Sequence, residues 1–295
     1  MKIVKLMGGL GNQMFQYAFA KLIGDDVLFD TSSWYLKENK LVNLEHLHVE
    51  LQNFNTRISV ATDEQIKQCL NETYIGYKLN KFLRRYNKKL LPSNRIYEKV
   101  LNQFQKEILT CDSDAYYEGF FQSIYYLNDI REKLLSDFTP KNELEESNKI
   151  ILEDILNSNS VAVSVRHGID YIDLGWNIEA DYYLKAIDVL SKRITNLQFF
   201  VFSDDIEWCK KIIPNSYKIT FVNSKDSNCG YTCGIYLMSK CKHNIISNST
   251  YAWWGAWLNN NPDKIIIYPQ KWIPIKSHLK TIYSELFPSS WLAID

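Results

Sequence analysis

The stretch MGGLGNQMFQYAFAKLI, residues 7–23, decides the fold, because a turn with three glycines joins a short apolar run to a helix-like run. The run KIVKL before it, residues 2–6, is typical of a buried strand, and VLFDTSS after it, residues 27–33, is typical of another. A strand, a helix and a strand in that order indicate the start of a doubly wound parallel sheet. The chain therefore opens as an α/β protein.

The glycine turn favours a binding role. Glycines between a strand and a helix let backbone amides approach a bound group, and a helix N-terminus favours negative charge. Gly9 and Gly11 match the first half of the dinucleotide fingerprint G-x-G-x-x-G, but Met14 replaces its last glycine, and no lysine completes a P-loop. Asn12 and Gln13 instead offer neutral hydrogen-bonding groups to a polar ligand in a cleft. A purely structural turn is the alternative.

Composition limits the class of protein. Of 295 residues 46% are hydrophobic, which permits sizeable cores and argues against extensive disorder. The 34 basic and 34 acidic residues balance, which argues against a nucleic-acid partner. We find neither a secretion signal nor an apolar run of about 18 residues, so we expect a soluble, cytoplasmic protein.

The six cysteines are scattered and form no Cys-x-x-Cys unit, so we expect reduced thiols. Cys229 and Cys233, four residues apart, are the alternative as metal ligands, with His243 as a weak third. No companion pair supports a zinc site, and we predict no metal.

Two units are predicted, residues 1–157 and 158–295. Residues 61–157 are rich in helix formers and long charged side chains and predict a helical insertion in the first unit. Within them, residues 77–99 carry eight basic residues and one acidic residue. This stretch, above all residues 78–99, is either a solvated helix face or a docking surface for anionic lipid or an anionic acceptor.

The second unit alternates strands with helices of about ten residues, which predicts a parallel sheet with its ligand site at the carboxyl ends of the strands. Arg166 and Asp170 follow its first strand, and arginine suits bidentate contact with phosphate. An exposed ion pair between these two residues is the alternative. Asp204 and Asp205 end the next strand, where they suit helix capping, a divalent ion or the edge of a nucleobase.

A later strand is followed by polar residues and then by a helix. These residues are Ser247, Asn248, Ser249 and Thr250. Hydroxyls and amides at a helix start form a further anion site. The three tryptophans of WWGAW, residues 253–257, are most simply the buried face of that helix.

With these motifs in this order, the chain resembles the bacterial α-1,2-fucosyltransferases of glycosyltransferase family 11. They share GGLGNQMFQYA near the start, FSDD in the second half, and SNST followed by WWGAWLN. EGFFQSIYYL, residues 118–127, looks like the family's Gly-Tyr-Trp-Gln-Ser segment. The resemblance covers nearly the whole chain. It implies a GT-B fold, two Rossmann-like domains facing across a cleft, and an inverting transfer of L-fucose from GDP-fucose to the 2-hydroxyl of a galactose, without metal or other cofactor.

The resemblance also implies roles for individual residues. Arg166 would hold the donor diphosphate, Asp204 or Asp205 would read guanine, and Ser249 and Thr250 would contact the β-phosphate side. The turn with Gly9, Gly11, Asn12 and Gln13 would line the facing wall, near the acceptor.

One turn departs from the family pattern. H-x-R-R-x-D reads here Ser164, Val165, Arg166, His167 and Gly168, with Ile169 inserted before Asp170. A titratable ring replaces a fixed cation, which bears on donor identity and turnover. His167 is one hypothesis for a proton acceptor. The base is open among Asp170, Asp173 and Glu179.

We therefore predict a metal-independent α-1,2-fucosyltransferase that uses GDP-fucose and a galactose-terminated glycan of a surface polysaccharide. A lipid-linked acceptor would place the enzyme at the inner face of a membrane. The alternatives are a transferase with another nucleotide sugar and a catalytically silent binder of glycan or nucleotide.

Overall fold

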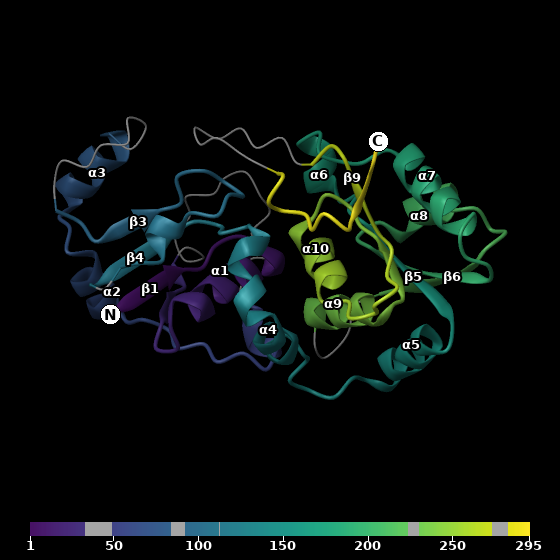
Figure 1. Ribbon diagram of the computed structural model, residues 1–295, viewed down its shortest axis with the longest axis horizontal. Coiled ribbons are helices and arrows are strands. Elements are labelled where there is room, and N and C mark those ends of the chain that lie inside the picture. The colour runs from purple at the N-terminus through teal and green to yellow at the C-terminus, as the bar shows by residue number, and fades with distance from the viewer. Residues whose placement is uncertain (33–48, 84–91, 112, 224–229, 273–282) are drawn as a thin grey trace.

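The computed structural model describes residues 1–32, 49–83, 92–111, 113–223, 230–272 and 283–295. These residues form two parallel β-sheets with their helices, one sheet in each half of the chain, side by side along the long axis of the molecule (Figure 1). The predicted α/β class and parallel pairing are confirmed.

The first sheet has the strand order β2-β1-β4-β3, and every pairing is parallel. Its strands are β1 (Lys2–Lys5), β2 (Leu28–Asp30), β3 (Arg95–Tyr97) and β4 (Ala115–Glu118). The glycine turn leads from central β1 into α1 (Leu10–Ile23). Because β2 and β4 lie on opposite sides of β1, the turn stands at the switch point of the sheet, where ligands bind in such folds.

The middle of the first half is not wholly helical, and the predicted helical insertion is incomplete. Its helices are α2 (Asp63–Leu70), α3 (Tyr74–Leu83), α4 (Arg131–Asp137) and α5 (Glu146–Leu156). Short 3-10 turns are η3 (Leu51–Asn53), η5 (Lys106–Ile108), η6 (Ile124–Tyr126) and η7 (Asn128–Ile130). However, β3 and β4 also lie within residues 61–157. These three- and four-residue strands are too short to show a periodic pattern, and they are defined by the pairing of β4 with β1 and of β3 with β4.

The second sheet has the order β10-β9-β8-β5-β6-β7, again all parallel. Its strands are β5 (Asn159–Val165), β6 (Leu197–Ser203), β7 (Lys218–Val222), β8 (His243–Ile245), β9 (Ile266–Pro269) and β10 (Leu292–Ile294). Numbered from β5, this is the strand order of the dinucleotide-binding fold, with its switch point between β5 and β8.

The helices of this half are α6 (Ile169–Asp173), α7 (Ala180–Ser191), α8 (Ile206–Ile212), α9 (Gly230–Lys240) and α10 (Thr250–Trp257). The predicted strands and helices are present. The short α6 and β10 were not predicted.

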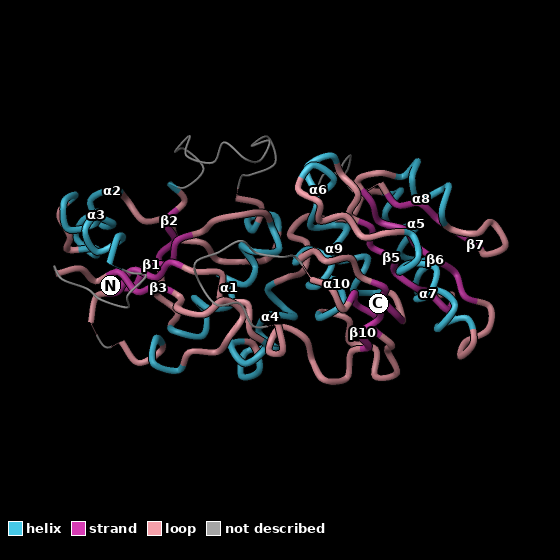
Figure 2. The backbone as a smooth tube through the Cα atoms, turned by 90° about the horizontal axis from the view of Figure 1, so that it is seen from above, coloured by secondary structure: helices cyan, strands magenta, loops and turns pink. Residues whose placement is uncertain are grey.

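The two halves meet through α1 and α10, which lie between the sheets (Figure 2). Phe15 on α1 packs with its ring centroid 4.7 Å from that of Trp253 and 4.8 Å from that of Trp254. The indole nitrogen of Trp254 donates to the carbonyl of Gly11 at 2.9 Å. The tryptophans of α10 are buried, as predicted, and one hydrophobic core runs through both halves. The two sheets thus face one another as predicted for a GT-B fold, while the boundary at residue 157 stays a prediction.

One cysteine contradicts the prediction of reduced thiols. Cys69, Cys111, Cys209 and Cys241 are free, but Cys233 is disulfide-bonded. The prediction rested on the compartment and on the missing Cys-x-x-Cys units, and neither excludes a single bridge.

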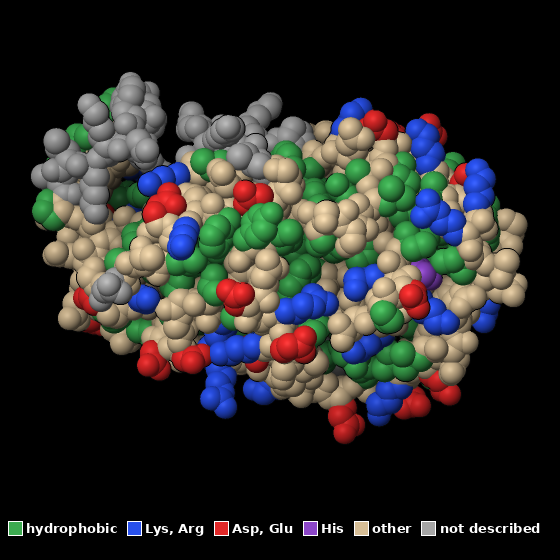
Figure 3. Space-filling model, in the orientation of Figure 1, with side chains coloured by type: hydrophobic (Ala, Val, Ile, Leu, Met, Phe, Trp, Pro, Cys, Tyr) green, Lys and Arg blue, Asp and Glu red, His purple; other side chains and the backbone are tan. Residues whose placement is uncertain are grey.

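Charge is interspersed over the surface. On the face shown in Figure 3, basic and acidic side chains of the coloured residues alternate over both halves. The overall charge balance is therefore also local on this face, and the absence of a nucleic-acid partner stays a prediction.

The contact between the halves leaves no room for a side chain at residue 11. A Cβ atom there would lie 2.5 Å from the carbonyl carbon of Thr250 and from the amide nitrogen of Tyr251, both backbone atoms. We expect Gly11→Ala to lower the free energy of unfolding by about 1–3 kcal/mol, because α1 and α10 must separate. At Gly9 a Cβ atom meets nothing within 4 Å, so Gly9→Ala is the matched control. Denaturant unfolding of both variants tests this, and equal stability would contradict it.

Candidate active site

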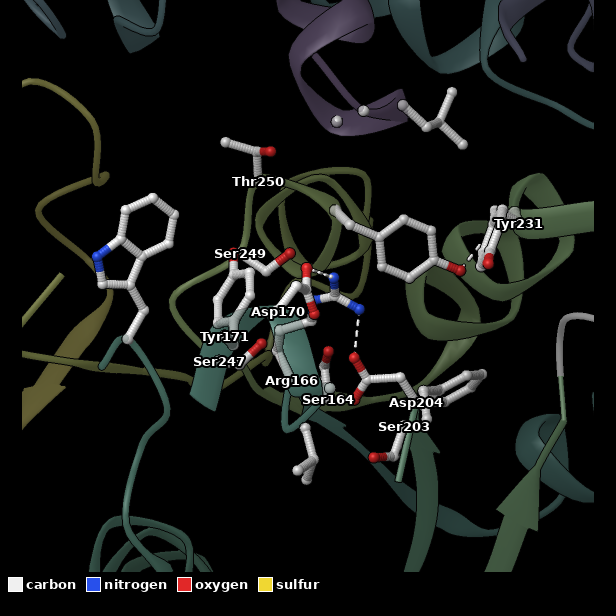
Figure 4. Close-up of a pocket in the computed structure, with 18 of the residues that line it drawn as sticks. Ser164, Arg166, Asp170, Tyr171, Ser203, Asp204, Tyr231, Ser247, Ser249 and Thr250 are labelled. Carbon is white, nitrogen blue, oxygen red and sulfur yellow. Dashed lines mark hydrogen bonds and ion pairs between the residues drawn. The ribbon is translucent and has the colours of Figure 1, made fainter. Parts of the chain in front are cut away.

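A cavity of about 530 Å³ lies at the carboxyl ends of strands from both sheets (Figure 4). The first half lines it with Gly9, Leu10, Gly11, Asn12 and Glu50. The second half supplies residues that end or follow β5, β6 and β8, together with residues of α6, α9 and α10. The cavity therefore lies at the switch points of the two sheets and faces both halves of the chain.

Nine of the predicted site residues line this cavity. They are Gly9, Gly11, Asn12, Ser164, Arg166, Asp170, Asp204, Ser249 and Thr250. Four others, His167, Asp205, Asn248 and Gln13, do not.

Arg166 stands in a cage of acidic and aromatic groups. Its guanidinium donates to Asp204, and to Asp170 at 2.5 Å, and it lies over the ring of Tyr171, 4.7 Å from the centroid (Figure 4). Burial opposes the charge, but the carboxylates of Asp204 and Asp170 outweigh it and raise the pKa of Arg166. The ion pair between Arg166 and Asp170, considered from the sequence as an alternative, is present, and both side chains are half-buried in the wall of the cavity. Arg166 remains a fixed cation.

Gly168, in the turn that departs from the family pattern, permits this cage. A Cβ atom there would lie 2.6 Å from an oxygen of Asp204 and 2.8 Å from an oxygen of Asp170. Any larger residue would push one carboxylate away from Arg166.

His167 faces away from the cavity. Its ring stacks on Trp208, with centroids 4.1 Å apart, and its Nδ1 lies 2.9 Å from Asp205. Its backbone amide donates to Asp204 at 2.8 Å. Asp205 caps α8 by accepting from the amide of Trp208, and this bond, followed by the one with His167, lowers the pKa of Asp205. His167 and Asp205 thus hold the turn and Asp204 in place.

The start of α10 offers open polar groups. Ser247 and Asn248 are buried, and neither the Ser247 hydroxyl nor the Asn248 side-chain oxygen has a hydrogen-bond partner among the described residues. Asn248 donates through its side-chain nitrogen to the carbonyl of Trp176 at 2.8 Å. Ser249 precedes the helix without capping it through its side chain. Ser247 and Ser249 line the cavity at this helix N-terminus, and hydroxyls in such a place suit an anion, whereas Asn248 lies outside the lining.

The glycine turn uses its two amide side chains differently. Asn12 lines the cavity, and its side-chain oxygen accepts from Gln122 at 2.8 Å and from Thr250 at 3.1 Å, which ties α1 to α10. Gln13 is fully buried, donates to the carbonyl of Gly8, and accepts from the backbone amide of Glu50 at 3.2 Å. Gln13 therefore acts beneath the cavity wall.

Sequence reasoning missed Glu50. This residue lines the cavity although it is only 4% exposed, and burial raises the pKa of its carboxyl to about 7. It stands just before η3, in a stretch without a recognised motif, and its contact with Gln13 spans 37 residues of chain. We find no signal in the sequence that marks it.

The described lining carries one basic side chain, Arg166, and the acidic side chains of Glu50, Asp170 and Asp204. In the part of the chain that the structure describes, no three or more His, Cys, Asp or Glu residues are grouped so as to hold a metal ion. Metal independence stays a prediction.

Comparison with known proteins identifies the family. Residues 1–294 match the model of Glycosyl transferase family 11. The chain belongs to glycosyl transferase family 11. The predicted family is thus confirmed across the chain, and glycosyl transfer of the α-1,2-fucosyltransferase type is the activity class of this family 11 protein.

Two bacterial relatives align over nearly their whole lengths. An Escherichia coli protein named alpha-1,2-colitosyltransferase is 33% identical over 99% of this chain and 98% of its own length. The O-antigen biosynthesis glycosyltransferase WbnK of Escherichia coli is 32% identical over 97% and 98%. Among solved structures, the fucosyltransferase NodZ from Bradyrhizobium matches with a TM-score of 0.46 at 13% identity over 86% of this chain and 91% of that one.

Glu50 should destabilise the folded protein when it is ionised. Because burial raises its folded pKa from 4.5 to about 7, the stability of the wild type falls as pH rises through this window. We expect Glu50→Gln to raise the free energy of unfolding by about 2–3 kcal/mol at pH 8.5 and to change it little at pH 4. Denaturant unfolding at both pH values measures this, and a variant less stable than the wild type at pH 8.5 would show that the charge is compensated.

Proposed function

We propose that the protein is an inverting, metal-independent glycosyltransferase that moves L-fucose from GDP-fucose to the 2-hydroxyl of a galactose in a surface glycan. The observation that carries the proposal is that Arg166 and the N-terminus of α10 line one cavity, in a family 11 chain. Transfer from a nucleotide sugar needs stabilisation of the leaving diphosphate, and a fixed cation with helix amides supplies it.

Asp204 is the residue that we assign to guanine. Asp204 directly follows β6 and lines the cavity, whereas Asp205 lies outside the cavity and caps α8. Guanine presents two neighbouring N–H donors on its Watson–Crick edge, and a carboxylate can accept from both at once. A guanine on Asp204 would free part of the Arg166 guanidinium for the diphosphate.

GDP-colitose is the second candidate donor. The 33% identity with a protein named alpha-1,2-colitosyltransferase favours it. Colitose is L-fucose without its 3-hydroxyl, so a site that bonds this hydroxyl would reject colitose strongly, whereas an apolar wall would not. Side-by-side transfer assays with both donors decide between them.

An active enzyme is favoured over a silent binder. His167, the main departure from the family pattern, lies outside the cavity, while Arg166 and Asp170 of the same turn line it. The altered turn therefore keeps Arg166 in the wall of the cavity.

Nucleotide binding tests the donor site. We expect calorimetry to show binding of GDP in preference to UDP and ADP, unchanged by magnesium or a chelator. Arg166→Ala should weaken GDP binding about 10- to 100-fold, because charge-assisted bonds are lost. Exposed Arg193 is the matched control, and Arg193→Ala should change nothing. A preference for UDP, or binding only with metal, would contradict the proposal.

We also infer that α3 docks on an anionic membrane, which would present a lipid-linked acceptor at the inner face. Tyr74, Ile75 and Phe82 are 70%, 74% and 57% exposed on α3, and Lys78 and Lys81 share this helix. Exposed apolar groups beside lysines suit the interface of a negatively charged bilayer. Part of residues 78–99 lies outside the described residues. Within the described residues, no helix has the length and apolar character needed to cross a bilayer.

Liposome sedimentation tests this surface. We expect binding to vesicles that contain phosphatidylglycerol but not to pure phosphatidylcholine, and Ile75→Asp should reduce it at least several-fold. Ile150 on α5 is 57% exposed and provides the matched variant Ile150→Asp, which should bind as the wild type does. Equal binding of all three proteins would rule out α3 as the docking surface.

A further inference from the structure

The proposed transfer needs a group that takes the proton of the acceptor hydroxyl, and the residues considered from the sequence fit poorly. Asp173 and Glu179 are exposed and do not line the cavity. Asp170 lines it but bonds to Arg166 at 2.5 Å, on the wall assigned to the diphosphate. A base that receives the acceptor should instead lie on the opposite wall.

Glu50 lies on that wall. It lines the cavity together with Gly9, Gly11 and Asn12 of the first half, while Arg166 belongs to the second half. Glu50 also acts on Tyr231 of α9, another lining residue. The pKa of Tyr231 is raised by burial first and by the Glu50 carboxylate second.

Glu50 is held in place from below. Gln13 accepts from its backbone amide at 3.2 Å, and Gln13 is itself fixed by donation to the carbonyl of Gly8. On the other side, the Glu50 carbonyl accepts from Asn53 at 3.0 Å in η3, where Leu51 is fully buried. The backbone of Glu50 is thus anchored on both sides, which a group that transfers a proton precisely requires.

We propose that Glu50 is the general base of this enzyme, an inference that rests on the proposed function. The acceptor oxygen forms a bond to the anomeric carbon of the donor sugar, on the face opposite the diphosphate. The bond from this carbon to the phosphate oxygen breaks, and its electron pair leaves on the diphosphate beside Arg166. The proton of the hydroxyl passes to a carboxylate oxygen of Glu50 and is later released to water.

The pKa of Glu50 suits this role. A general base works best when its pKa lies near the working pH, and burial raises the pKa of Glu50 to about 7. The other titratable and charged groups among the described lining residues are Tyr231 on α9, Tyr251 on α10, Asp170 and Tyr171 on α6, Arg166 after β5 and Asp204 after β6. The activity of the wild type should therefore rise with pH and level off above about 7.

Three variants of the full chain test the base. Glu50→Gln should lower kcat about 100- to 10,000-fold, leave GDP binding unchanged and remove the rise of kcat/KM near pH 7. Glu50→Asp should restore part of the activity together with the pH dependence, because it restores a carboxylate. Glu179→Gln, in which an exposed acid outside the cavity is changed, should behave as the wild type does.

The outcomes separate the two proposals. A wild type that binds no GDP or transfers no sugar would overturn the proposed function, and with it any base. A wild type that transfers sugar while Glu50→Gln keeps its kcat and its pH profile would overturn only the role of Glu50. Loss of GDP binding in Glu50→Gln would likewise overturn it, since the residue would then support the donor.

Discussion

The close approach of α1 and α10 is the contact on which the rest of the structure depends. Gly11 has no side chain, so its backbone lies against the backbone of Thr250 and Tyr251 and offers its carbonyl to the indole of Trp254. The same contact brings the two switch points of the sheets to a single cavity. A bare turn after the first strand is therefore needed for packing as much as for binding.

The electrostatics of the cavity follow from Arg166. Asp170 and Asp204 share the guanidinium of Arg166, and the described lining has more acidic than basic side chains. Binding of a diphosphate is therefore opposed by charge repulsion unless one of these carboxylates finds another partner. In the proposed function, guanine on Asp204 would provide that partner, so recognition of the base and release of the arginine would be the same event. Selection for guanine would then be built into phosphate binding, and Gly168 is the residue that makes this geometry possible.

The sequence predicted most of the second sheet because its strands alternate regularly with helices, and because β5, β6 and β7 run for five to seven residues. It predicted nine lining residues because parallel strands bring their carboxyl ends together. It failed at β3 and β4, whose three or four residues gain their identity only by pairing. It also failed at Glu50, because nothing local distinguishes a surface glutamate from one that the fold buries. The disulfide of Cys233 was missed for another reason, because the expected compartment and the missing Cys-x-x-Cys units argued for reduced thiols.

Asn12 and Gln13 have different roles, because Asn12 bonds to the other half of the chain and Gln13 bonds to the backbone of Glu50. Asn12 bonds to Thr250 of the other half and to Gln122, so it fixes the width of the cavity. Gln13 points into the core and fixes the backbone of Glu50. Because the two residues are adjacent on α1, a shift of this helix relative to α10 changes the distance from Glu50 to Arg166 as well as the opening between them. If Glu50 is the general base, the contact between α1 and α10 would couple the packing of the two halves to proton transfer, and the burial of its carboxyl would be a cost in stability that the activity requires.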